Sequence, residues 1–171
     1  MHSQAATAED QLPRIRWPAH YAPAHAPVHV RNEIQIAAAP AIVWAWLTQA
    51  PRWPQWYLNS RNLKILRGNA AQLESGSRFV WTTFGVRITS EVQECVPEAR
   101  LAWDAKSLGV DAYHAWLLTP TADGGCHVLT EETQHGFVAR SGAWLFPTRM
   151  HRFHQIWLEA LRDRAMGGPP R

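Results

Sequence analysis

One segment near the C-terminus constrains the fold more than any other. Residues 146–165 read FPTRMHRFHQIWLEALRDRA, and apolar residues recur every three or four positions along them. This period predicts a helix with one wide apolar face, formed by Met150, Phe153, Trp157, Leu158, Leu161 and Ala165. Pro147 suits the first turn, and Gly167 and Gly168 end the helix. At about 1.5 Å per residue it spans roughly 28 Å, so its aromatic face needs a large concave partner.

The middle of the chain predicts a sheet that can serve as this partner. Alternating or β-branched runs joined by short turns indicate antiparallel strands. They cover residues 28–37, 61–67, 78–84, 86–95, 100–106, 110–119 and 127–137. Two short helices are expected after the first strand, one opening at Pro40 and one between Pro51 and Asn59. The fold class is therefore α+β, with a domain at 27–166, an extended or partly disordered arm at 1–26 and a tail at 167–171.

Composition narrows the classes of function. Hydrophobic residues make up 46% of the 171 residues and charged residues 18%, which is typical of a globular domain. The net charge of +3 and the absence of Lys/Arg runs argue against nucleic-acid binding. The two cysteines, Cys95 and Cys126, are too far apart for a metal knuckle. No apolar run approaches the ~20 residues that cross a bilayer, and no signal peptide is evident, so we expect a cytoplasmic protein.

The order of elements resembles the START-like helix-grip (SRPBCC) superfamily, in particular its polyketide cyclase/dehydrase group. The resemblance rests on IAAAPAIVWAWLTQAPRWPQWY (36–57), ITSEVQECVPEARLAW (88–103), HAWLLTP (114–120) with GGCHVLTEE (124–132), and HQIWLEAL (154–161). It implies a curved antiparallel sheet around the C-terminal helix, with a mostly apolar cavity between them under the two short helices. Members bind lipids, sterols or polyketides, and some catalyse aldol cyclisation or dehydration.

Strand alternation identifies candidate polar residues in this cavity. If Leu118 faces Val128 across the turn between the last two strands, then Trp116 faces Thr130 and His114 faces Glu132. A buried His–Glu pair could abstract a proton beside a carbonyl group. The same pair could equally be structural, with the two side chains satisfying each other inside the sheet. The opposite strand faces are also fairly apolar, so the direction in which these side chains point stays open.

Other candidates would bind the ligand. Flat or polycyclic ligands could stack on Trp81, Trp103 and Trp116, and the remaining predicted contacts are Thr130, Met150, Phe153, His154 and Trp157. His151 and His154 are spaced to share a helix face, and Glu131, Glu132 or His135 could complete a zinc site. Such a spacing is common by accident, so we expect neither a metal nor a cofactor.

Three functions are consistent with these features. The favoured one is binding of a hydrophobic small molecule in the cavity, and the second is a cyclase or dehydratase that uses His114 and Glu132. The third is an interaction protein whose exposed Trp53 and Trp56 dock a partner. The sequence does not decide whether the chain forms a homodimer.

Overall fold

The computed structural model describes residues 14–170, which form seven strands and three α-helices. The strands are β1 (Val28–Ile36), β2 (Arg61–Arg67), β3 (Arg78–Thr83), β4 (Val86–Val96), β5 (Arg100–Ser107), β6 (Val110–Pro120) and β7 (Cys126–His135). The helices are α1 (Pro40–Thr48), α2 (Phe137–Leu145) and α3 (Arg149–Met166). A 3₁₀ helix at Ala50–Gln55 follows α1, as the proline-rich sequence there predicts.

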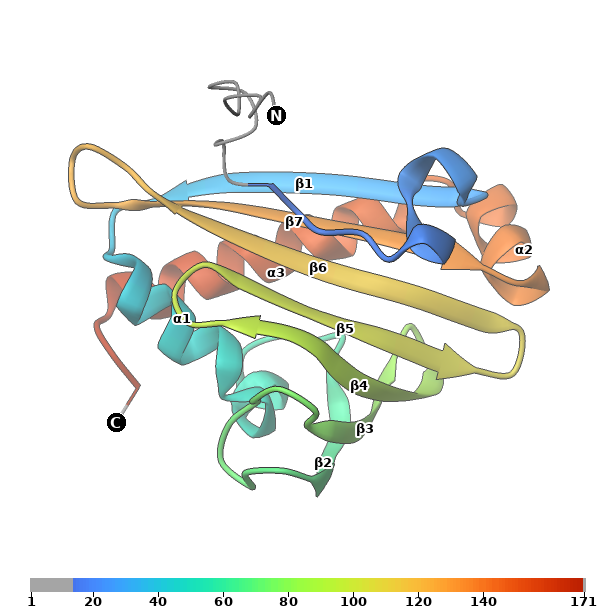
Figure 1. Cartoon of the computed structure of the whole chain (residues 1–171), viewed down its shortest axis with the longest axis horizontal. Helices are drawn as coiled ribbons and strands as arrows, with labels where there is room; N and C mark the ends of the chain where they lie inside the picture. The colour runs from blue at the N-terminus through green and yellow to red at the C-terminus, as the bar shows by residue number, and fades with distance from the viewer. Residues whose placement is uncertain (1–13, 171) are drawn as a thin grey trace, which may run out of the picture.

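The strands form one antiparallel sheet in the order β1-β7-β6-β5-β4-β3-β2. The sheet curves around α3, which runs along one of its faces and contacts β1 and α1 (Figure 1). The helix-grip fold predicted from the sequence is confirmed. Within the described residues, no helix combines the length and the apolar character needed to cross a membrane.

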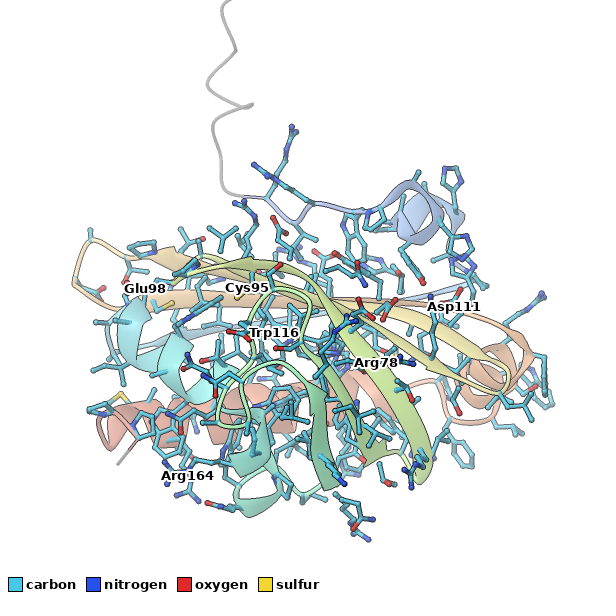
Figure 2. The ribbon with its side chains drawn as sticks, turned by 60° about the horizontal axis from the view of Figure 1, so that its bottom comes forward. Arg78, Cys95, Glu98, Asp111, Trp116 and Arg164 are labelled. Atoms are coloured by element: carbon cyan, nitrogen blue, oxygen red, sulfur yellow. The ribbon has the colours of Figure 1, made fainter. Side chains whose placement is uncertain are left out.

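The core between sheet and helix is built from aromatic rings. Trp157 of α3 stacks on Tyr57 with centroids 4.3 Å apart, and its ring edge meets Trp53 at 5.0 Å and Trp116 at 5.1 Å. Trp116 lies near the middle of the molecule, between the sheet and α3 (Figure 2). Edge-to-face and offset contacts of this kind favour one relative placement of the rings. The apolar face of α3 is therefore fixed against the sheet.

The short 3₁₀ helix after α1 belongs to this core. Trp53 is fully buried and donates its indole N–H to the carbonyl oxygen of Leu47 at 3.1 Å. Trp56 is only partly exposed. The hypothesis of an exposed Trp53–Trp56 docking patch is therefore wrong, because the ring that was to carry it fills the interior.

Two boundaries near the C-terminus differ from the prediction. The last strand ends at His135 rather than at residue 137, and α3 begins at Arg149, after Pro147 instead of at Phe146. Between them lies α2, which the sequence pattern did not predict. Gly136 permits the change of direction with a φ of 102°, and a Cβ there would lie 2.3 Å from the carbonyl oxygen of Gly109. Only glycine fits this close approach at positive φ.

Residues 14–26 cover the face of the sheet opposite α3 (Figure 1). They form two short 3₁₀ turns, at Ala19–Tyr21 and Pro23–His25. Tyr21 is buried, stacks on Tyr113 at 5.2 Å and donates a 2.6 Å hydrogen bond to Asp111. The rest of the predicted arm, residues 1–13, lies outside the described residues.

We expect Trp53→Ala to lower the free energy of unfolding by about 3–5 kcal/mol, because it removes a fully buried ring from the aromatic core. Trp144→Ala is the matched control, since that ring is 81% exposed, and it should change stability by less than about 0.5 kcal/mol. Urea denaturation of both variants measures the difference. Equal destabilisation by the two substitutions would contradict the assigned core.

Candidate functional site

A cavity of about 200 Å³ lies between the inner face of the sheet, α3 and α2. Three kinds of surface meet in it: aromatic rings, aliphatic strand residues and a small polar group. The lining residues that the argument uses are Tyr57, Trp81, Trp103, Ala112, His114, Glu132, Gln134, Val138, Ala139, Gly142, Ala143, Phe146, Met150, His154 and Trp157.

The polar group consists of His114 on β6, Glu132 on β7 and His154 on α3, all buried. His114 and Glu132 are direct cross-strand partners, as the predicted register requires. Glu132 Oε2 lies 3.3 Å from His114 Nδ1 and 3.1 Å from His154 Nε2. The two imidazole rings are nearly parallel, with centroids 4.8 Å apart. Two nitrogens from different elements thus converge on one carboxylate oxygen.

Neighbouring side chains fix the orientation of this cluster. His114 Nε2 lies 2.8 Å from Thr130 Oγ1, and that hydroxyl donates in turn to the carbonyl oxygen of Ala115 at 3.3 Å. The Thr130 hydroxyl therefore holds the imidazole ring of His114 at its Nε2 edge. Gln134 donates to Glu132 Oε1 at 2.6 Å. The other ring nitrogen of His114, Nδ1, is the one that lies beside Glu132.

Burial sets the charge of the cluster. Burial lowers the pKa of His114 well below its ordinary value, although the nearby Glu132 acts in the opposite direction. Burial alone would raise the pKa of Glu132, but hydrogen bonds from His154 and Gln134 and the charge of the two histidines lower it. Near neutral pH the site combines an ionised carboxylate with a neutral His114. Within residues 14–170, the ion-pair partners recorded for Glu132 are histidines rather than lysine or arginine.

The structure brings most of the predicted site residues together. His114, Glu132, Trp81, Trp103, Met150, His154 and Trp157 all line the cavity. Three others lie behind the wall or beside it. Trp116 is buried beneath Trp103 and Trp157, Thr130 is fully buried as the hydrogen-bond partner of His114, and Phe153 packs edge-on against Phe84 at 5.3 Å.

Sequence reasoning missed the element that closes one end of the cavity. The expected roof was the pair of short helices after β1, but no residue of α1 lines the cavity, and Tyr57 alone represents that region. Helix α2 contributes Val138, Ala139, Gly142 and Ala143 instead. Their spacing of one, three and one residues follows a helical face. This helical spacing is present in the sequence, but the residues that carry it are small and the Ser141-Gly142 pair resembles a loop.

The zinc grouping considered from the sequence does not assemble as expected. His151 is exposed, and Glu131 pairs with His29 at 2.7 Å on the outer part of the sheet. His154 points into the interior and meets His114, a residue that the helix spacing did not suggest. The ligand atoms of His114, Glu132 and His154 all lie within 4.8 Å of one another, so among residues 14–170 these three could hold a metal ion.

Comparison with known families identifies one match. Residues 27–166 match the model of a family described as polyketide cyclase / dehydrase and lipid transport. No protein of curated function matches the chain significantly.

Solved structures with the same architecture extend this result. A hypothetical protein from Helicobacter pylori is 30% identical, with a TM-score of 0.83 over 94% of this chain and 99% of that one. The di-domain ARO/CYC StfQ from the steffimycin biosynthetic pathway is 16% identical, with a TM-score of 0.66 over 82% of this chain and 51% of that one. Norcoclaurine synthase from Thalictrum flavum, solved with dopamine and hydroxybenzaldehyde, is 13% identical, with a TM-score of 0.63 over 84% of this chain and 89% of that one. The last two likenesses concern the fold.

The closure of the cavity by α2 can be tested with two glycines. Gly136→Ala should lower the free energy of unfolding by about 2 kcal/mol or more, because it adds a clash at a positive φ. Gly142→Ala is the matched control, because a Cβ there meets nothing within 4 Å, and it should stabilise α2 by about 0.5–1 kcal/mol. Chemical denaturation measures both effects. Destabilisation by Gly142→Ala with no effect of Gly136→Ala would contradict the placement of α2.

Proposed function

The chain belongs to the polyketide cyclase/dehydrase and lipid transport family, and we propose that it binds a compact, ring-containing hydrophobic molecule in the cavity between the sheet and α3. The observation that carries this proposal is the cavity itself, walled by Trp81, Trp103 and Trp157 on one side and by the His114–Glu132–His154 cluster on another. An apolar cavity with a few convergent polar groups is the usual form of a small-molecule site.

The size of the cavity favours a small ligand. Most ligand pockets measure about 300–1,000 Å³, whereas this one measures about 200 Å³. A dry cavity of about 150 Å³ is enough to bind benzene. We therefore expect one or two rings rather than a long acyl chain or a polycyclic skeleton. Norcoclaurine synthase, which has a similar fold, was solved in complex with two single-ring molecules, dopamine and hydroxybenzaldehyde.

The polar residues of the wall support a ligand that also carries oxygen. His114, Glu132 and Gln134 line the cavity beside the aromatic rings. A hydroxyl group on the ligand would form hydrogen bonds with these side chains, and a few convergent polar groups of this kind fix the orientation of a bound molecule.

Cyclisation or dehydration by Glu132 acting as a base with His114 is the second candidate function. Its support is the position of the cluster in the cavity wall, where a carbonyl compound would meet it. The lowered pKa values of Glu132 and His114 make both groups weak bases near neutral pH, and general bases work best with a pKa near the working pH. Binding therefore ranks first.

Binding is tested by titrating the purified protein with one-ring and two-ring phenols while following tryptophan fluorescence, since three indoles line the cavity. We expect saturable quenching by these probes and weaker binding of a long-chain fatty acid. Ala112→Leu, which adds a side chain to the cavity wall, should weaken binding about tenfold or more, equivalent to about 1.4 kcal/mol.

Ala71→Leu is the matched control, because Ala71 is exposed and far from the cavity wall. It should leave the affinity unchanged. Equal affinity of wild type and Ala112→Leu would contradict binding in this cavity, and stronger binding of the fatty acid than of the phenols would contradict the compact ligand. Native mass spectrometry of the protein as purified gives an independent mass for any molecule it retains.

A further inference from the structure

The buried cluster in the cavity wall has the donor set of a metal centre. His114, Glu132 and His154 each offer one ligand atom, these atoms all lie within 4.8 Å of one another, and all three side chains are buried. Two imidazole nitrogens and one carboxylate oxygen are ligands that Zn²⁺ and Fe²⁺ bind readily. The residues come from β6, β7 and α3, so the packing of the whole domain holds them together.

The distances from the carboxylate oxygen to the two imidazole nitrogens fit coordination to a single ion. Two ligands that each lie about 2.0–2.1 Å from a tetrahedral ion are roughly 3.3 Å apart. In the structure, Glu132 Oε2 lies 3.3 Å from His114 Nδ1 and 3.1 Å from His154 Nε2. Metal ligands also have hydrogen-bond partners that orient them. Thr130 holds His114 through Nε2, and Gln134 holds Glu132 through Oε1, which leaves Nδ1 and Oε2 for an ion.

A cation suits the charge of the cluster. His114 Nε2 is already paired with Thr130, so Nδ1, which lies 3.3 Å from Glu132 Oε2, is the nitrogen left to bind an ion. Glu132 is buried, and the ion-pair partners it has within the described residues are histidines. An ion bound to Oε2 would neutralise this buried carboxylate.

We propose that His114, Glu132 and His154 bind one divalent transition-metal ion of the Zn²⁺ or Fe²⁺ type through Nδ1, Oε2 and Nε2, respectively. Three protein ligands leave at least one coordination position open, and it faces the cavity because the same three residues line it. The site is independent of which organic molecule the cavity binds.

The test uses full-length protein freed of metal with a chelator and kept reduced. Titration with Zn²⁺ by calorimetry should show one ion per chain, and Co²⁺ should give the visible absorption of a tetrahedral nitrogen- and oxygen-ligated ion without a thiolate charge-transfer band. The absence of a thiolate charge-transfer band excludes coordination by Cys95 or Cys126, both of which are free thiols. Zn²⁺ should also raise the unfolding temperature, because an ion that binds only the folded state stabilises it.

Variants locate the ion. Glu132→Gln keeps the shape of the side chain and removes its charge, and the unfolding temperature of the metal-free variant is its own reference for the effect of Zn²⁺. Thr130→Val removes the hydroxyl that positions His114 and should weaken Zn²⁺ binding roughly 10–100-fold. We expect Glu132→Gln to weaken it further and to abolish the thermal stabilisation by Zn²⁺.

Two controls exclude surface histidines. His151→Ala changes an exposed residue one turn before His154, and His135→Ala breaks the outer pair in which His20 and His135 stack at 4.4 Å. Both variants should bind Zn²⁺ like wild type. The proposal is overturned if wild type binds no ion, or if Glu132→Gln binds as tightly as wild type. Loss of binding in His135→Ala with full binding in Glu132→Gln would also overturn it, because the ion would then occupy the surface.

Discussion

The fixed position of Trp157 is the constraint on which the rest of the interior depends. Its ring contacts residues from the 3₁₀ region, β3, β5 and β6, namely Trp53, Tyr57, Trp81, Trp103 and Trp116. With a ring held on several sides, α3 can neither rotate nor slide without breaking close packing. His154 precedes Trp157 by three residues and shares its helix face. The packing of one tryptophan thus sets the position of His154 against β6 and β7.

The parts of the site that depend on strand geometry could be predicted from the sequence. The register of His114 with Glu132 follows from a two-residue period and a short turn, and both are local properties. The contact between His154 and Glu132 depends on where a helix lies relative to a sheet, and spacing along the helix does not contain that information. For the same reason Trp116 was expected in the wall, whereas it lies behind two other rings.

The elements outside the sheet were harder to predict for different reasons. Helix α2 turns small residues, Ala139, Gly142 and Ala143, towards the cavity and leaves its large apolar residues Phe137, Trp144 and Leu145 exposed, so its apolar pattern does not mark the face that packs. Its start depends on the close approach of Gly136 to Gly109, a contact between residues far apart in sequence. The binding of residues 14–26 to the sheet likewise rests on Tyr21, whose partners Asp111 and Tyr113 lie on β6.

The polar cluster is a place in the core where this chain departs from what packing alone would favour. A buried ion pair is often less stable than apolar residues of similar volume. Here His114 stacks on Trp116 and contacts the tilted ring of Trp103, so the cluster is surrounded by aromatic side chains. A sequence that otherwise fills its interior with rings gains no stability from placing a carboxylate and two imidazoles there. The cluster lines the cavity and lies in direct reach of anything bound in it. The fold itself requires neither the loss of stability that the cluster causes nor its position in the cavity wall. Both are explained if the cluster acts on a molecule that enters the cavity.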